Sequence, residues 1–289
     1  YGLVGSEMCI RDRNSLYNNN IGTICGDKQG HIYIRCKYAV VEYDIKKNTF
    51  HTIRDNDIQA ITYDNARLWV CTRDSLFTYN RVEDRLDYYY NLEGVRMSCV
   101  TEDSAGNLYV GTMNNGLYMI DHNKKWLNYF PKKDITCIYE DSKKSIWVGT
   151  KDDGLFRLDR NGGITNYGTA PHQNMLSSSY VRCVVEDNLG NYWIGTFKGL
   201  DKLDVTTGTF THYSKDNKPY SLSNSSIICM MKDRQGTFWI GTYYGGVNLF
   251  NPDYEIYTYY YPDESQKGKL TSPFAGRMTE DSNGGKVEE

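Results

Sequence analysis

Short runs of alternating apolar and polar residues occupy most of the chain. Residues 180–186 (Tyr-Val-Arg-Cys-Val-Val-Glu) and 192–196 (Tyr-Trp-Ile-Gly-Thr) are two such runs, and the polar stretch 187–191 separates them. Runs of β-branched and aromatic residues divided by turn residues predict β-strands, and no helical period of 3.6 residues is present. The pattern therefore predicts an all-β chain.

The same pair of runs recurs along the sequence. Its second run carries an aromatic residue followed, in most copies, by Ile or Val and then glycine, and these aromatic residues lie 36 to 46 residues apart: Tyr33, Trp69, Tyr109, Trp147, Trp193 and Trp239. A period of about 40–50 residues with four short strands per unit is typical of β-propeller blades. We expect a β-propeller of four-stranded antiparallel blades, with the aromatic residue buried between neighbouring blades.

The repeat spacing divides the chain into six blades and part of a seventh. The expected blades cover residues 21–56, 57–94, 95–133, 134–177, 178–224 and 225–272, and residues 273–289 hold the start of another. We expect a seven-bladed propeller with a truncated last blade, forming a single domain over residues 14–289. Residues 1–13 do not fit the repeat, and we interpret them as a non-native, adaptor-like segment.

A short polar turn joins the first two strands of each unit. In residues 178–224 the turn opens with Asp187 and closes with Gly190. These are the preferences of a type I turn, because Asp accepts hydrogen bonds from nearby backbone N–H groups and Gly adopts positive φ. The equivalent turn at residues 64–67 is shorter and lacks the glycine. We expect the acidic residue before each turn, such as Glu186, to be solvated.

The acidic pairs at 102–103, 140–141 and 186–187 raise the question of acid–base catalysis. A catalytic pair is needed once, whereas these pairs recur at one position beside each turn. Adjacent strand residues also face opposite sides of a sheet, so the two carboxylates diverge. No nucleophile elbow and no phosphate-binding glycine loop is present. We therefore expect a protein that is not an enzyme.

Charge, histidine and cysteine usage narrow the choice of partners. The net charge of −3 gives no basic footprint for nucleic acid, and no apolar run is long enough to span a membrane. The five histidines lack close ligand spacing, so no metal and no cofactor is expected. Equivalent positions circle a propeller axis, so we expect small buried thiols and no disulfides at four matching first-strand positions: Cys99, Cys137, Cys183 and Cys229.

The phrase Glu-Asp-Ser-x-Gly-x-Leu-Tyr/Trp-Val/Ile-Gly-Thr-x-x-x-Gly-Leu resembles the two-component regulator propeller repeat. Residues 102–117 are a near-ideal copy, and residues 140–155 and 186–200 are close copies. The resemblance implies the periplasmic sensor region of a hybrid two-component histidine kinase of Bacteroidetes. It also implies an oligosaccharide ligand, and a signal passed to sensor and kinase domains that lie downstream in the same parent protein, outside this chain.

Binding residues are expected where the blades differ from one another. The loops after the second strands should open on one face of the ring, where aromatic side chains stack on sugars and cations bind hydroxyl or acidic groups. The alternative for each residue is an ordinary solvated loop tip. The candidate ligand-binding residues are Tyr38, Arg73, Lys151, Phe197, Lys198, Tyr243 and Tyr244.

Two other functions stay open at the level of sequence. A polysaccharide lyase or glycosidase would need an unrepeated acid–base pair facing the central funnel, and the sequence offers no clear candidate for one. A protein-interaction scaffold, such as a module that forms a homodimer, would need no such pair. Product analysis and oligomeric state would distinguish these alternatives from an oligosaccharide sensor.

Overall fold

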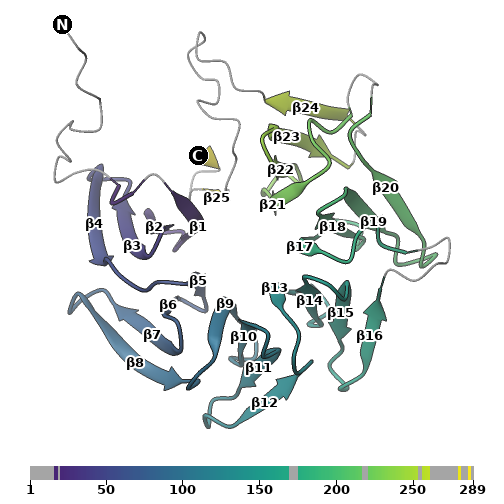
Figure 1. Cartoon of the computed structure of the whole chain (residues 1–289). Helices are drawn as coiled ribbons and strands as arrows, with labels where there is room; N and C mark the ends of the chain where they lie inside the picture. The colour runs from purple at the N-terminus through teal and green to yellow at the C-terminus, as the bar shows by residue number, and fades with distance from the viewer. Residues whose placement is uncertain are drawn as a thin grey trace, which may run out of the picture.

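The computed structural model describes residues 16–18, 20–168, 175–216, 221–252, 256–260, 279–280 and 286–287. Within these ranges six four-stranded antiparallel sheets follow one another around a ring (Figure 1). Spatial order equals chain order in every sheet, and the first strand is the innermost one. None of these residues forms a helix with the length and hydropathy that crossing a bilayer requires.

Blades 1 to 3 consist of strands β1 (Ile21–Gly26), β2 (His31–Cys36), β3 (Ala39–Asp44), β4 (Thr49–Arg54), β5 (Ala60–Asp64), β6 (Arg67–Cys71), β7 (Ser75–Asn80), β8 (Arg85–Asn91), β9 (Arg96–Glu102), β10 (Leu108–Met113), β11 (Leu117–Ile120) and β12 (Trp126–Tyr129). Blades 4 to 6 consist of strands β13 (Ile135–Glu140), β14 (Ile146–Thr150), β15 (Leu155–Leu158), β16 (Ile164–Tyr167), β17 (Val181–Glu186), β18 (Tyr192–Thr196), β19 (Leu200–Leu203), β20 (Phe210–Tyr213), β21 (Ile227–Lys232), β22 (Phe238–Thr242), β23 (Gly246–Asn251) and β24 (Ile256–Tyr260).

The propeller fold and its six blades are confirmed. A separate antiparallel pair, β25 (Thr279–Glu280) and β26 (Lys286–Val287), follows the sixth blade, and β25 contacts β1. The structure thus shows six blades, and the seventh blade expected from the sequence is not shown. Residues 1–13 and most of 273–289 lie outside the described residues.

The aromatic residue of the second strand fills the space between neighbouring blades, as the sequence predicted. Trp193 on β18 is 1% exposed and packs on Phe238 and Phe250 of blade 6, with ring centres 5.7 and 4.8 Å away. Its indole Nε1 donates a hydrogen bond to Asp187 Oδ2 at 3.0 Å. Trp147 and Trp239 make the same bond within their own blades. The turn aspartate therefore also orients the buried indole in blades 4, 5 and 6, whereas Trp69 of blade 2 donates to Glu102 of blade 3 at 2.7 Å.

The glycine after the aromatic residue makes room for the next blade. A Cβ atom on Gly195 would collide with Cys183 Sγ of the same blade and with Ile227 of blade 6. Gly149 faces Cys137 and Val181 in the same way. The described cysteines form no disulfide; of the four expected to be buried thiols, Cys229 is buried, whereas Cys99, Cys137 and Cys183 are only half-buried. Cysteine and glycine thus occupy paired positions because together they fit a narrow inter-blade layer.

The turn aspartate caps its turn as predicted. Asp187 Oδ1 accepts hydrogen bonds from the backbone N–H groups of Leu189 and Asn191 at 2.9 and 2.8 Å. Gly190 has a φ of 83°, which lies in the left-handed region that glycine tolerates.

The expectation that the preceding glutamate is solvated was wrong. Glu186 is 5% exposed, and its two carboxylate oxygens accept hydrogen bonds from the backbone N–H and the hydroxyl of Ser142 at 2.7 and 2.6 Å. Glu140 binds Ser104 in the same way. A buried carboxylate is stable only when donors satisfy it, and the neighbouring blade supplies them here. We call this arrangement the Glu–Ser clamp.

Candidate functional site

The loops that follow the second strands lie beside the links that enter the first strands. Backbone hydrogen bonds join the two, from Lys151 N to Asp134 O at 3.1 Å, from Phe197 N to Tyr180 O at 3.0 Å and from Tyr243 N to Ser226 O at 2.9 Å. These loops therefore open on one face of the ring, which we call the loop face. The aspartate turns lie on the opposite face.

The seven residues predicted from the sequence all lie on the loop face and are exposed. Tyr38 and Arg73 belong to blades 1 and 2, and the others belong to blades 4, 5 and 6. The exposed fractions of the aromatic members are 51% for Tyr38, 51% for Phe197, 44% for Tyr243 and 61% for Tyr244. Rings this exposed contribute little to the core, so they are available to contact a ligand.

Arg182 on β17 joins part of this set, and sequence reasoning missed it. Its Cζ atom lies 4.7 Å from the ring centre of Tyr180 and 5.2 Å from that of Phe197. The two rings stack with centres 6.2 Å apart and planes 13° apart. A comparison across blades could have found it, because Arg182 is charged where blades 3 and 4 carry Ser98 and Thr136.

Tyr243 and Tyr244 extend this group into blade 6. Their rings meet edge to face, with centres 4.4 Å apart. The hydrogen bond with Tyr244 raises the pKa of Tyr243 above its ordinary value, and the positive charge of Arg182 acts in the opposite direction. Arg182 is thus within electrostatic reach of Tyr243. We call Tyr180, Arg182, Phe197, Tyr243 and Tyr244 the aromatic–arginine group.

The remaining predicted residues lie apart from this group. Lys151 Nζ is 3.9 Å from Asp134 Oδ2, a contact within blade 4. Lys198 donates its backbone N–H to the Thr196 hydroxyl at 3.2 Å, and its side chain is exposed. Among the contacts described for the chain, none joins Tyr38 or Arg73 to Arg182. The structure therefore gathers Phe197, Tyr243 and Tyr244 but leaves Tyr38 and Arg73 in another sector.

A central channel of about 260 Å³ is lined by the first strands of all six blades. Arg182 is the single charged residue among its described lining residues, which otherwise carry aliphatic, thioether, thiol or hydroxyl side chains. Five of them are cysteines: Cys25, Cys99, Cys137, Cys183 and Cys229. In the described part of the chain, no group of three or more His, Cys, Asp or Glu residues is arranged to hold a metal ion.

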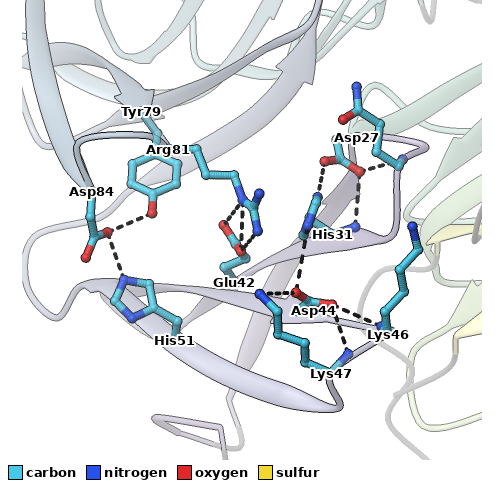
Figure 2. A network of polar contacts seen from close by, with 11 residues as sticks. Asp27, His31, Glu42, Asp44, Lys46, Lys47, His51, Tyr79, Arg81 and Asp84 are labelled. Atoms are coloured by element: carbon cyan, nitrogen blue, oxygen red, sulfur yellow. Dashed lines mark hydrogen bonds and ion pairs between the residues drawn. The ribbon is translucent and has the colours of Figure 1, made fainter.

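A second cavity, of about 330 Å³, lies between blades 1 and 2 on the opposite face (Figure 2). Arg81 donates to both carboxylate oxygens of Glu42 at 3.0 to 3.2 Å. Asp84 accepts hydrogen bonds from Tyr79 at 2.7 Å and from His51 at 2.8 Å, and these two bonds lower its pKa. Glu42 and His51 belong to blade 1, whereas Arg81 and Asp84 belong to blade 2, so these bonds join the two blades. The same bonds satisfy both carboxylates.

Asp44 completes the floor of this cavity. It accepts hydrogen bonds from the backbone N–H groups of Lys46 and Lys47, and Lys47 Nζ lies 3.2 Å from it. His31 contacts Asp27 on one side and faces Asp44 at 3.9 Å on the other (Figure 2). The cavity is thus walled by groups that pair with one another.

Three segments of the chain, residues 129–152, 175–198 and 221–244, match the family described as two component regulator propeller. These segments are two-component regulator propeller repeats. Each one covers the first two strands of a blade and part of the loop that follows, so Ser142 and Glu186 and the candidate loop residues of blades 4 to 6 fall within the matched segments. None of the curated proteins compared with the chain matches it.

Solved propellers share the fold. The extracellular domain of a Bacteroides thetaiotaomicron protein named as a hybrid two component system superposes with a TM-score of 0.69 at 21% identity, over 98% of this chain and 45% of that one. PorZ of the type-IX secretion system of Porphyromonas gingivalis gives 0.72 at 14% identity, over 93% and 45%. Virginiamycin B lyase from Staphylococcus aureus gives 0.71 at 13% identity, over 92% and 90%. At these identities the likeness shows the fold alone.

Proposed function

We propose that this chain is a non-catalytic sensor propeller of a hybrid two-component signalling protein. It binds an oligosaccharide on its loop face, in the periplasm, and relays binding to sensor and kinase domains elsewhere in the parent protein. The aromatic–arginine group carries the proposal, because it gathers exposed rings and a cation at one mouth of the channel. The regulator propeller repeats support the signalling role.

Sugar recognition follows from the chemistry of this surface. Aromatic rings offer flat apolar faces to the C–H groups of a sugar ring, while neighbouring polar groups bind its hydroxyls. Phe197 and Tyr244 are both more than half exposed and flank the charged Arg182 and the phenol of Tyr243. Lys198 follows Phe197 directly and adds a second cation to the same blade.

The proposal includes a closed ring of seven blades within a domain over residues 14–289. Figure 1 shows β25 in the space between β1 and β21, and β25 contacts β1. A strand pair at this place supports the proposal, because the inner half of a further blade would supply two such strands. Closing the ring would cover the blade faces that border this space, which is how repeat folds protect their ends.

Tyr243→Ala tests the binding site. We expect the affinity for a bound oligosaccharide to fall at least tenfold, since a stacked ring contributes on the order of 1.4 kcal/mol or more. A glycan array identifies a ligand for the full chain, and calorimetric titration measures its affinity. Tyr88→Ala is the matched control, because Tyr88 is 63% exposed on the outer strand β8.

Arg73→Ala decides how far the site extends. Unchanged affinity in this variant would confine the site to blades 5 and 6, and a loss would extend it across the channel mouth to blade 2. The absence of binding to any glycan on the array would contradict the proposal as a whole.

A further inference from the structure

Arg182 occupies a β-bulge that recurs in the first strand of several blades. The pairing of β17 with β18 skips this residue, passing from Val181 to Cys183. Blades 4 and 6 skip Thr136 and Ile228 in the same register. A bulge leaves one residue outside the ladder and re-aims its side chain, and bulges concentrate beside functional sites. Here the bulged residues face the neighbouring blade and the channel.

In blades 3 and 4 the bulged side chain is a hydroxyl that links two blades. Ser98 Oγ donates to Ile135 O at 2.6 Å, and Thr136 Oγ1 donates to Val181 O at 2.5 Å. Arg182 makes the equivalent bond with Nη1, which donates to Ile227 O at 3.0 Å. The structural task of this position thus needs one donor, which a hydroxyl supplies in the preceding blades.

The Arg182 guanidinium carries more hydrogen-bond donors than this position needs. Nη1 also donates to Ser226 Oγ at 3.0 Å, but Nε and Nη2 have no hydrogen-bond partner among the described residues. Neither atom is among the fully buried polar atoms that lack a partner, and Arg182 as a whole is half-buried. Tyr180 and Phe197 lie against the guanidinium and restrict its orientation. An arginine fork is therefore held in place with one edge unused.

We propose that this edge of Arg182 binds the anionic group of an acidic oligosaccharide, a carboxylate or a sulfate, at the channel mouth. The inference rests on the proposed function and specifies its ligand class. The planar Nε and Nη2 donors match two oxygens of such a group, which a lysine could not do. No carboxylate pairs with Arg182 among the described residues, so an anionic ligand would meet an uncompensated positive charge.

Arg182→Thr separates the binding role from the structural one. The variant copies Thr136, so it keeps a donor for Ile227 O while it removes the charged fork. Thermal melting should therefore show a nearly unchanged midpoint. Arg182→Lys keeps the charge without the fork and should bind with intermediate affinity. Lys143→Ala is the control for net charge, because Lys143 is exposed in the β13–β14 turn on the opposite face.

The binding experiment uses four probes with the full chain in calorimetric titration: tetragalacturonate, its methyl ester, a sulfated galactose oligosaccharide and the neutral galactose oligosaccharide. We expect one charged probe to bind at least tenfold more tightly than its neutral counterpart. Arg182→Thr should abolish that preference, and Lys143→Ala should leave it intact. The ester arm isolates a carboxylate requirement, and the sulfated arm isolates a sulfate requirement.

The outcomes separate this inference from the proposed function. Equal affinity for charged and neutral probes, unaffected by Arg182→Thr, would overturn the anionic ligand and leave oligosaccharide binding in place. A preference for charged probes that survives in Arg182→Thr would move the anion site to another residue and overturn the role of Arg182. Failure of all four probes and of the glycan array would overturn both proposals together.

Discussion

Blades 4 and 5 are joined by buried groups, whereas blades 1 and 2 add ion pairs to a buried layer that includes Tyr33 and Ile61. Between blades 4 and 5, Trp147 lies 4.2 Å from the ring of Tyr192, whose hydroxyl donates to Asp141 at 2.7 Å. The Glu186 carboxylate is buried beside Ser142.

Between blades 1 and 2 the outer strands add charged contacts. Arg81, whose side chain is 44% exposed, binds Glu42, and His51 and Asp84 bind each other with about half of each side chain exposed (Figure 2).

In both joints a carboxylate of one blade accepts hydrogen bonds from the neighbouring blade. The chemical type of the donor differs between the two joints. Neutral donors satisfy Glu186, and a cation satisfies Glu42. The two joints should respond differently to salt. Dissolved ions weaken interactions between exposed charges, with a screening length of about 10 Å at 0.1 M ionic strength, but act little on buried groups. The joint between blades 1 and 2 should therefore respond to ionic strength, and the joint between blades 4 and 5 should not.

Trp193→Ala would disrupt a joint made by buried groups and has the largest expected effect on stability. Removing a fully buried indole between blades 5 and 6 should cost about 3–5 kcal/mol in the free energy of unfolding. Denaturant titration measures the loss. Trp126→Ala is the control, because Trp126 is 52% exposed on the outer strand β12 and should cost much less. Equal losses in the two variants would contradict the inward role of Trp193.

Glu186→Gln and Glu42→Gln test the two joints directly. In the first variant one hydrogen-bond donor of Ser142 faces the NH₂ group of the new glutamine and loses its acceptor. The loss should lower the free energy of unfolding by about 1–3 kcal/mol at any salt concentration. In the second, Arg81 keeps the amide oxygen as an acceptor but loses the negative charge, so the cost should be at most about 1 kcal/mol and should shrink in 1 M salt. Melting curves at low and high salt measure both. The same salt dependence in both variants would refute the distinction.

Ala66→Gly changes the turn of blade 2 that lacks glycine. It has the smallest expected effect on stability of these variants. Asn65 and Ala66 both have positive φ, at 46° and 61°. A left-handed conformation costs an alanine about 1 kcal/mol, and glycine does not incur it, so the variant should be stabilised by about that amount. Gly190→Ala in blade 5 is the reverse experiment and should destabilise. A lower melting temperature for Ala66→Gly would contradict the claim that the left-handed conformation of Ala66 destabilises the fold.

The repeated positions of this protein could be read from its sequence. Period-two alternation located the strands, and in blade 5 the predicted runs 180–186 and 192–196 agree with β17 and β18 within one residue at each end. The recurring aromatic residue indicated an inter-blade layer, because a position kept in six units at one register has to meet the same environment in each. The turn chemistry of Asp187 and Gly190 was predictable for a local reason, since both act on the backbone beside them.

The contacts between blades could not be read in this way. Glu186 looked like a solvated residue until the fold placed Ser142 of the preceding blade against it, 44 positions earlier in the chain. Arg182 looked like an ordinary strand residue, because the β-bulge that takes it out of the ladder becomes visible only when β17 pairs with β18.

Local sequence thus determined the strands, the turns and the blade repeat through short-range backbone preferences. Only the tertiary structure decided which side chains of neighbouring blades meet. That depends on the stacking of whole sheets around the axis, and the same stacking decided that Arg182 stands among aromatic rings at the channel mouth.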